Sequence, residues 1–385
     1  MDGIFMSIND QVRFRIIEEF RSGRLNRVEA ALKLGVSVRA ISRFARKIRK
    51  QGIRGTKHGN YGKVPRNRIS SEVRDFYVSL YRKKYAKFNF SHALEKILEL
   101  ESPSQRVSYD VFRRWCRKEG LGKVKKRRCS KAHFRRERSA NEGFMLQMDG
   151  SPHKWNGKDE WTMIATIDDA TSDVGPCEFF ESETTWGCMT VMQRVIERKG
   201  IPEFILTDCA GWSTGGAKRQ GFSQFVRACD ELGIKVIGTP SAESKGRVER
   251  LNRTMQDRLV PELDLLGIKL MKDANRYLEQ VFLPDLRKRI GIEAKSSETR
   301  YRSIPEGVDV RKVFCLKYHR QVNRDHTVQF EAQQYDLKFD GVGSLWKKEV
   351  RIHKYKDGEI EIYHGHRSLR FALVRPKRRY AWGNK

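Results

Sequence analysis

The sequence predicts a multidomain α+β protein with two N-terminal helical units, a mixed α/β core and a small β-rich C-terminal domain. Three observations lead to this prediction. The length of 385 residues allows about two to four domains. Apolar residues recur at helical spacing up to residue 121, strand and helix patterns alternate from 143 to 266, and short strand patterns follow residue 301. Positive charge is also concentrated at the two ends of the chain.

The charge distribution indicates a polyanionic partner. Lys and Arg number 78 against 48 Asp and Glu, a net charge of +30. Residues 1–138 hold 37 basic and 13 acidic side chains, residues 139–300 hold 22 and 25, and residues 301–385 hold 19 and 10. This segregation favours two ends that hold nucleic acid around a near-neutral middle with a different task.

Composition also excludes several classes of protein. Aromatic residues make up 10% of the chain, which argues against a wholly disordered basic protein. Apolar stretches such as Met163–Ile167 are too short to span a bilayer, and the N-terminal residues do not resemble a signal peptide. The seven cysteines form no C-x-x-C pair, so neither a disulfide framework nor a Cys-rich zinc site is expected. We therefore expect no membrane association and a cytoplasmic, or at least intracellular, location.

Residues 1–50 read as a helix-turn-helix DNA-binding domain. Gly35-Val36-Ser37 is a tight turn between two helical patterns, and Ser37 is placed to cap the second helix. The apolar residues at helical spacing on either side of the turn are Val28, Ala31, Leu32, Leu34, Val38, Ile41 and Ala45. The basic residues expected to face DNA from the second helix are Arg39, Arg43, Arg46, Lys47 and Lys50. An ordinary basic helical hairpin is the alternative interpretation.

A second helix-turn-helix-like domain is expected at residues 70–121, between basic linkers at 51–69 and 122–138. Ser108 caps its last helix, in which Val111, Phe112 and Trp115 face inward. The outward cations of that helix, expected to contact DNA, are Arg113, Arg114, Arg117 and Lys118. Two such domains on one chain indicate a long recognition site.

Residues 139–300 carry the pattern of an α/β core. Strand patterns cover GFMLQMDG, Glu160–Ile167 and Val174–Glu181. A helix at 184–199, a strand at Glu203–Asp208, a helix at 219–232, a strand at Ile234–Thr239 and a long helix from Lys245 to Leu266 follow. The order β-β-β-α-β-α-β-α is that of the RNase H-like fold, with a mixed five-stranded sheet.

Three carboxylates occur where this topology brings segments of the chain together. Asp149 lies on the first strand, Asp208 ends the fourth, and Glu249 lies in the first turns of the long helix. Converging carboxylates repel one another unless cations compensate them, and hard oxygen ligands suit Mg²⁺ or Mn²⁺. Two such ions could serve an in-line phosphoryl transfer. Asp168 and Asp169 are interpreted as a turn pair, and Glu243 competes with Glu249 for the third position.

These segments resemble a known family. QMDGSPH at 147–153, LTD at 206–208 and KGRVERLNRTMQDRL at 245–259 are similar to the integrase-core transposases of bacterial insertion sequences, relatives of the retroviral integrases. The resemblance covers nearly all of the chain and implies that Asp149, Asp208 and Glu249 are both the catalytic Asp-Asp-Glu (DDE) triad and the metal ligands. It also implies DNA contacts for Lys245 and Arg253, and it demotes Glu243. Ala242 stands where the family often has Pro.

Residues 301–385 read as a β-rich domain. Short strand patterns occur at Val313–Leu316, Thr327–Phe330, Gln334–Phe339, Glu349–Lys354 and Glu359–Tyr363. Five short strands are typical of a small SH3-like barrel. Basic residues follow at Arg375, Lys377, Arg378 and Arg379. We expect this domain to contact DNA or a partner subunit, and a purely structural role is the alternative.

The sequence thus predicts a DDE transposase, a polynucleotidyl transferase with two Mg²⁺ or Mn²⁺ ions per active site. Its expected partners are the double-stranded terminal inverted repeats of its element, target DNA, and further copies of the chain in a homodimer or larger assembly. It would cut the element end with water, and the freed 3′-hydroxyl would attack target DNA. Two alternatives are a DNA-binding regulator with an inactive core and a metal-dependent nuclease that does not join strands.

Overall fold

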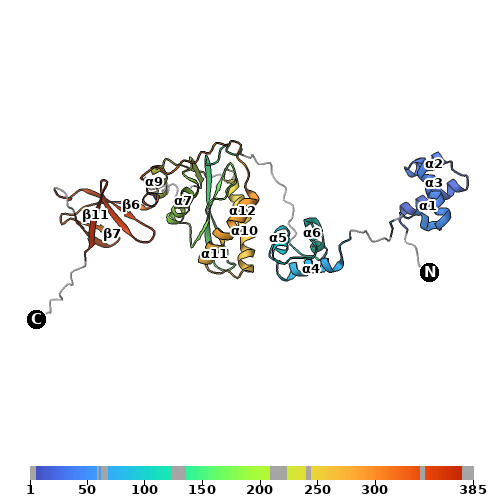
Figure 1. Ribbon diagram of the computed structural model, residues 1–385, viewed down its shortest axis with the longest axis horizontal. Helices are drawn as coiled ribbons and strands as arrows, with labels where there is room; N and C mark the ends of the chain where they lie inside the picture. The colour runs from blue at the N-terminus through green and yellow to red at the C-terminus, as the bar shows by residue number, and fades with distance from the viewer. Residues whose placement is uncertain are drawn as a thin grey trace. The chain divides into compact units, whose positions relative to one another are not determined.

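The computed structural model divides into two compact units, Met1–Arg74 and Asp75–Lys385 (Figure 1). It describes residues 6–58, 60–61, 68–122, 136–208, 223–239, 244–338 and 343–374. Glu243, the basic run at 375–379 and most of the two expected linkers lie outside these ranges. None of the helices in these ranges has both the length and the apolar character needed to cross a bilayer.

The first unit is a bundle of three helices, α1 (Ile8–Arg21), α2 (Arg27–Leu34) and α3 (Val38–Gln51), followed by the short helix η1 (Gly52–Thr56). Between α2 and α3, Gly35 takes a left-handed conformation with φ 62°, which costs a glycine little, and Ser37 caps α3 as expected. The small core shared by the three helices contains Ile16, Ile17, Ala30, Ala31, Ile41 and Ile48.

Details of this unit differ from the expectation. Val28, Leu32 and Val38 are 57%, 77% and 42% exposed, so the apolar residues at helical spacing do not all belong to the inward face. The inward face is instead set by the small residues Ala30, Ala31 and Ala40, which allow the helices to approach closely. The unit also continues past residue 50, because Arg13 donates to the Thr56 carbonyl and Lys57 pairs with Asp10 at 2.8 Å.

The helices α4 (Ser71–Lys83), α5 (Phe90–Leu100) and α6 (Tyr109–Lys118) form the second helical part. The aromatic rings of Tyr81, Phe90 and Phe112 pack against one another at its centre. Arg113, Arg114 and Lys118 are exposed on α6, as predicted. Arg117 is half-buried instead, since its guanidinium lies over the Phe90 ring and donates to the Gly122 carbonyl.

The central sheet has the predicted mixed arrangement, with strand order β3-β2-β1-β4-β5. Its strands are β1 (Met145–His153), β2 (Trp161–Asp168), β3 (Glu178–Phe180), β4 (Phe204–Thr207) and β5 (Lys235–Gly238). β2 runs antiparallel to both β1 and β3, whereas β4 runs parallel to β1 and β5 runs parallel to β4. The predicted third strand was too long, because only Glu178–Phe180 form a ladder with β2, and Val174 makes a single isolated bridge to Ile167.

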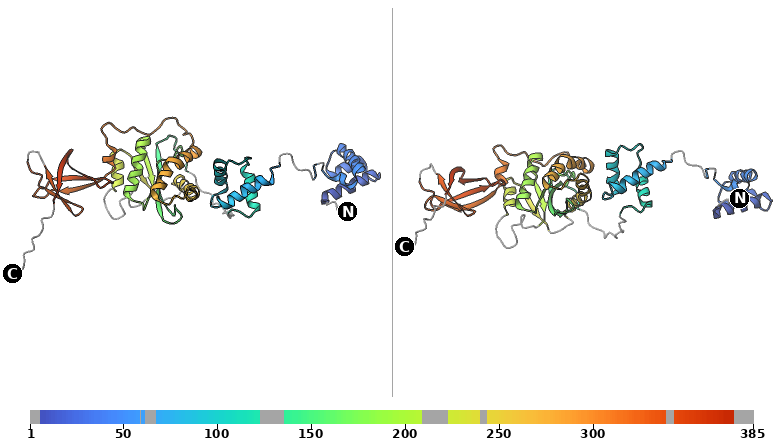
Figure 2. Two further views of the ribbon diagram at one scale, coloured as in Figure 1. Left: turned by 60° about the horizontal axis from the view of Figure 1, so that its bottom comes forward. Right: turned by 90° about the horizontal axis from the view of Figure 1, so that it is seen from below.

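Helices cover both faces of this sheet, and the views in Figures 1 and 2 show the same layers. One face packs on α7 (Thr185–Lys199) and α9 (Gln224–Glu231), in a core that includes Leu146 and Met148. The other face packs on α10 (Gly246–Leu265). The same layer contains α11 (Met271–Tyr277), the π-helical turn η2 (Leu278–Phe282) and α12 (Leu283–Ile290), which follow α10 directly.

The C-terminal part is an antiparallel sheet of six strands in the order β6-β9-β10-β11-β8-β7. They are β6 (Leu316–Gln321), β7 (Thr327–Phe330), β8 (Gln333–Lys338), β9 (Glu349–Lys354), β10 (Ile360–His364) and β11 (Arg367–Leu373). Rings of Tyr318 and Phe330, on the two edge strands, lie 4.9 Å apart, so the sheet is nearly closed, as in a small barrel.

Two features of this part were not predicted. The strand expected at 313–316 is instead the end of a short helix, α13 (Val310–Val313), followed by the start of β6. Val310, Val313 and Phe314 pack into the core of the central sheet, so that core extends beyond residue 300. The sixth strand, β11, was missed because its arginines interrupt the apolar alternation.

Candidate active site

Asp149 and Asp208 are brought together by the register of two parallel strands. Gln147 on β1 pairs with Leu206 on β4. Asp149 and Asp208 each follow these paired residues by two positions. Side chains two apart on a strand share a face, so the two carboxylates lie on neighbouring strands at the same level of the sheet. The raised pKa of Asp149, to which Asp208 contributes, agrees with this proximity.

Helix α10 places a polar face over Asp149. The Lys245 ammonium lies 2.9 Å from Asp149 Oδ1, and the Asn252 side-chain amide donates to Asp149 Oδ2 at 3.0 Å. Glu249 stands between them, four residues after Lys245 and three before Asn252, and residues at these spacings share one side of a helix. The three sequence-predicted carboxylates therefore belong to one region of the fold.

The three carboxylates do not form a closed metal-binding cluster in this arrangement. Across the ranges that the structure describes, no group of three Asp, Glu, His or Cys side chains has the geometry to hold a metal ion. On the Asp149 side, the positive charge is instead supplied by Lys245, which was predicted to contact DNA. An ammonium group is thus the cation nearest to the candidate metal ligand.

The electrostatics of Asp149 show that this compensation is incomplete. Burial raises the pKa of Asp149, and the nearby Asp208 carboxylate raises it further. The hydrogen bonds from Lys245 and Asn252 act in the opposite direction but do not outweigh these effects. The ionised form of Asp149 is therefore held at a cost that additional positive charge would relieve.

One of two unsatisfied oxygens near this carboxylate pair fits the same interpretation. Thr207 Oγ1, next to Asp208, and Asn252 Oδ1, next to Asp149, are buried and accept or donate no hydrogen bond within the described residues. Buried polar atoms are normally satisfied, so each indicates a water or ion. Asn252 Oδ1 joins the carboxylates as a hard oxygen donor, the kind that Mg²⁺ or Mn²⁺ prefers, whereas the Thr207 side chain, one position before Asp208, faces the other side of the sheet.

Asp169 anchors the start of α10, a role that the sequence did not reveal. It was interpreted as half of a turn pair with Asp168, but its side chain is fully buried. Arg247, in the first turn of α10, donates to Asp169 Oδ1 at 2.6 Å. Gln147 donates to the same oxygen and accepts from the Val248 N–H at 3.0 Å. Two contacts therefore hold the first turn of α10, which carries Glu249, against β1.

The same carboxylate also receives groups from the segment that precedes the core. The Ser139 N–H and hydroxyl donate to Asp169 Oδ2, and the Arg136 guanidinium pairs with Oδ1. Burial alone would raise the pKa of Asp169, but these donors and Arg247 outweigh it and the pKa lies below its usual value. Asp169 is thus a fully compensated structural carboxylate. Several donors from distant segments meet there, and a single sequence gives no signal of such a contact.

A fourth carboxylate lies close to Asp149 in space. Gly150 follows Asp149 directly, and a Cβ atom built on this glycine would come within 2.5 Å of the Glu183 carboxylate. Glu183 also contributes, with Asp208, to the raised pKa of the Cys188 thiol, whose main cause is burial. Glu183 was not predicted as a site residue, because it immediately precedes the cap of α7 and looks like an ordinary helix-start acid.

The remaining predicted site residues are cations at the surface. Arg39, Arg43, Arg46 and Lys50 are exposed along α3, and Lys47 is half-buried on the same helix. Arg253 is exposed on α10, one turn beyond Glu249. Their positions are compatible with contacts to an extended polyanion, but they do not identify it.

Comparison with known proteins gives the following matches, although no family model matches the chain. The chain is 32% identical over 375 residues to "Putative transposase y4bF" of Sinorhizobium fredii, which covers 94% of this chain and 80% of that protein. It is 24% identical over 404 residues to the transposase for insertion sequence IS1202 of Streptococcus pneumoniae, covering 93% of this chain and 86% of that protein.

Two solved structures of retroviral proteins are also similar. One is a simian T-cell lymphotropic virus intasome in complex with a PP2A regulatory subunit, with 16% identity and a TM-score of 0.34, covering 78% of this chain and 100% of that chain. The other is the HTLV-2 integrase catalytic core domain in complex with magnesium, with 20% identity and a TM-score of 0.29, covering 37% of this chain and 90% of that chain.

The identity to the Sinorhizobium protein extends over nearly the whole chain, and the IS1202 transposase matches over a similar span. The sequence segments around Asp149, Asp208 and Glu249 occur in one region of the α/β core. On these grounds, the chain belongs to the integrase-like transposases of insertion sequences.

Proposed function

We propose that this transposase cuts the ends of its element and joins them to target DNA with Asp149, Asp208 and Glu249 as metal ligands. The observation that carries the proposal is the position of Asp149, which is half-buried beside Asp208 and covered by the face of α10 that bears Glu249. Membership of the family indicates the class of reaction, and the incompletely compensated carboxylate of Asp149 indicates where in the fold that reaction would occur.

The residues present suit a divalent cation. When bound, two Mg²⁺ or Mn²⁺ ions would activate the attacking oxygen and stabilise the leaving oxygen of an in-line phosphoryl transfer. Asp149 and Asp208 would hold these ions from the sheet, and Glu249 would approach from α10. Lys245 would then be released from Asp149 to contact DNA phosphates, together with Arg253, as the family resemblance implies.

The helical parts would hold the DNA. We propose that α3, with Arg39, Arg43 and Arg46, and α6, with Arg113 and Arg114, contact the double-stranded terminal repeats as recognition helices. Exposed cations on a helix following a tight turn are the usual arrangement for such contacts. The β-rich C-terminal part would contact flanking DNA or a second copy of the chain, since paired ends require at least a dimer in this family.

The experiment also distinguishes the transposase from two other functions. A DNA-binding regulator would bind the ends without cutting them, and a nuclease would cut without joining. The doubled helical unit favours recognition of specific ends over broad cleavage, and the intact carboxylate trio favours an enzyme over a regulator.

The substitution Glu249→Gln tests the proposal directly. It removes one negative charge without changing the size of a half-exposed side chain, so folding and end binding should remain nearly intact. Strand transfer with Mg²⁺, measured with the duplex DNA that flanks the chain's own gene, should fall below detection. Arg250→Gln, at the exposed neighbouring residue of α10, is the control and should leave strand transfer unchanged. If Glu249→Gln still joined DNA ends, the assignment of the triad would be wrong.

A further inference from the structure

We propose that a cleft between α6 and α10 binds the phosphate backbone of the element end about three to four nucleotides from the phosphate that is cut. The proposal rests on the proposed function, because Glu249 marks the cutting site. It adds a defined binding surface, and it assigns DNA contacts to Lys87 and Tyr109, which the sequence did not single out.

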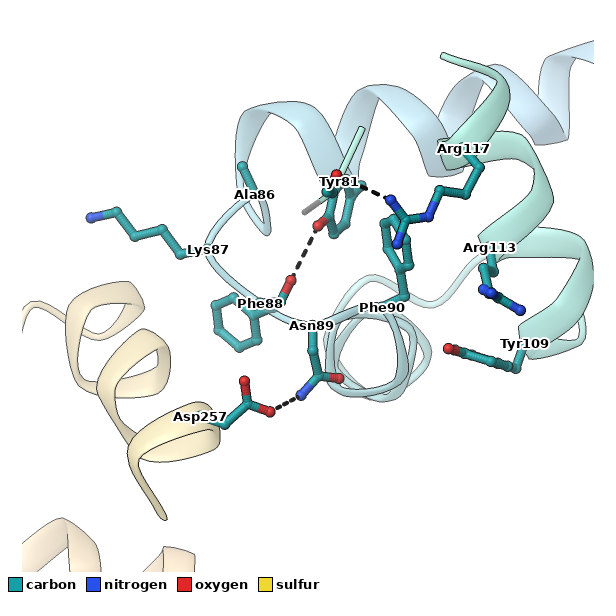
Figure 3. Close-up of a pocket in the computed structure, with 11 residues that line it drawn as sticks. Tyr81, Ala86, Lys87, Phe88, Asn89, Phe90, Tyr109, Arg113, Arg117 and Asp257 are labelled. Atoms are coloured by element: carbon teal, nitrogen blue, oxygen red, sulfur yellow. Dashed lines mark hydrogen bonds between the residues drawn. The ribbon is translucent and has the colours of Figure 1, made fainter. Parts of the chain in front are cut away.

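The cleft is open and has a volume of about 1120 Å³ (Figure 3). Its walls come from α4, the turn between α4 and α5, α5, α6 and one residue of α10. The lining residues used below are Lys87, Asn89, Phe90, Tyr109, Arg113 and Asp257. It therefore joins the second helical part to the helix that carries Glu249.

The chemistry of this cleft fits a phosphodiester backbone. Arg113 and Tyr109 lie one turn apart on α6 with their polar ends toward the cleft. Both side chains are exposed, and within the described residues neither makes a hydrogen bond or an ion pair. A guanidinium and a phenol with free donors are common phosphate ligands. Lys87 lies at the opposite wall with 72% of its side chain exposed, and its ammonium pairs with Asp264 at 2.7 Å, so a phosphate would compete with that carboxylate for it.

The Asp257 carboxylate also lines the cleft, but it is engaged in a contact with the protein. Asp257 accepts a hydrogen bond from the Asn89 side-chain amide at 2.5 Å, and this contact ties the α4–α5 turn to α10. Its carboxylate is thus directed at the junction between the two parts. The helical part that lines the cleft is modestly basic, since residues 75–122 carry 10 basic against 6 acidic side chains.

The cleft is held in place relative to α10 by a buried junction. His92 on α5 contacts Glu262 on α10 at 2.6 Å, and both side chains are nearly inaccessible to solvent. Lys96 lies 3.3 Å from the same carboxylate, and the Tyr277 hydroxyl donates to its second oxygen. Arg258 on α10 makes two hydrogen bonds to Glu95 on α5. These contacts fix the distance between the cleft and the catalytic end of α10.

That distance can be expressed in nucleotides. Asp257 follows Glu249 by eight residues on the same helix, which is about 12 Å along its axis. Successive phosphates of one DNA strand advance by about 3.4 Å. For a duplex whose axis lies parallel to α10, a strand that passes the exposed Arg253 would therefore lead from the cleft to Glu249 in about three to four nucleotides.

The experiment combines a protein variant with neutral phosphates in the DNA. The probe is the flanking duplex that the protein cuts, with single methylphosphonates placed at each of the ten positions next to the mapped cleavage site. Dissociation constants are measured for the full-length wild type, for Arg113→Ala, and for Arg106→Ala, which removes an exposed arginine of the same helical part that does not line the cleft. Circular dichroism confirms that the variants are folded.

Wild type should lose about tenfold in affinity when the contacted phosphate is made neutral. Arg113→Ala should bind the native duplex about tenfold more weakly than the wild type. Its affinity should not fall further when a phosphate three or four nucleotides from the cut is made neutral. Arg106→Ala should keep the sensitivity of the wild type at that position. Coupling of Arg113 to a phosphate more than six nucleotides away, or to none, overturns the proposed path.

These outcomes are separable from failure of the proposed function. If no flanking duplex is cut, or if Glu249→Gln still cuts, the assignment of the active site fails. The cleft proposal then fails with it, because its distance is counted from Glu249. If Glu249→Gln abolishes cleavage but Arg113 couples to no nearby phosphate, only the cleft proposal fails.

Discussion

Two carboxylates near opposite ends of α10, the buried Glu262 and the half-buried Asp149 of β1, differ in how well their charge is compensated. Glu262, near the C-terminal end, contacts His92, Lys96 and Tyr277. Burial alone would raise the pKa of Glu262, but these partners outweigh burial and the pKa is lowered. Asp149, facing the N-terminal end, also has a partner on each oxygen, yet its pKa is raised by burial and by Asp208.

The difference separates a structural carboxylate from a candidate metal ligand. A structural carboxylate recruits enough donors to stay ionised without help, as Glu262 and Asp169 do. A metal ligand must leave part of its charge uncompensated, because the ion supplies the rest. Each prediction below changes one of these compensating contacts, starting with the largest expected effect.

The largest effect on stability is expected from Asp169→Ala. This change leaves the buried Arg247 guanidinium, the Arg136 guanidinium and the Ser139 N–H without their acceptor. Removing one partner of a buried pair costs about 3–5 kcal/mol, and the partial exposure of Arg136 favours the lower figure. Hydrogen exchange should show faster opening of the first turns of α10.

Asp273→Ala is the matched control, since that exposed carboxylate makes only an i,i+3 ion pair with Arg276. It should change the free energy of unfolding by less than about 1 kcal/mol. Equal effects of Asp169→Ala and Asp273→Ala would show that Asp169 does not anchor α10.

A smaller effect is expected from Glu262→Gln at the other end of the helix. The amide keeps the shape but loses the charge that Lys96 and Tyr277 contact, a loss of about 2 kcal/mol. Because Glu262 joins α5 to α10, hydrogen exchange should increase in α5 while the central strands remain protected. Asp264→Asn, two residues further on and in exposed ion pairs with Lys87 and Lys269, should leave α5 protected.

The sequence predicted the core because its information there is local. Strands such as β2 are continuous apolar runs, and the long helix begins close to Lys245 as expected. That Asp149, Asp208 and Glu249 belong to one region could be predicted because each lies near the end or the start of a predicted element, and their role as a triad stays a prediction. The same local reasoning failed for Val28 and Leu32, since apolar spacing alone does not show which helix face small alanines bring inward.

Contacts between distant segments were beyond such reasoning. Asp169 was interpreted as a turn residue because the donors that bury it, Arg136 and Arg247, lie 33 and 78 residues away. The pairing of His92 with Glu262 spans 170 residues. Lys245 was predicted as a DNA contact, and only the fold shows that its ammonium reaches Asp149.

The smallest and most specific prediction concerns this ammonium. Lys245→Met keeps the length of the side chain but removes the positive charge from Asp149, which increases the repulsion between Asp149 and Asp208. If the ammonium takes the place of a metal ion in the free protein, Mn²⁺ should bind the variant about fivefold to tenfold more tightly in calorimetric titration without DNA. Arg250→Met removes an exposed charge nearby and should leave Mn²⁺ affinity unchanged. Weaker Mn²⁺ binding by Lys245→Met would instead mean that Lys245 positions the carboxylates for the ion. The opposite pKa shifts of Asp149 and Glu262 would then not distinguish a metal ligand from a structural carboxylate.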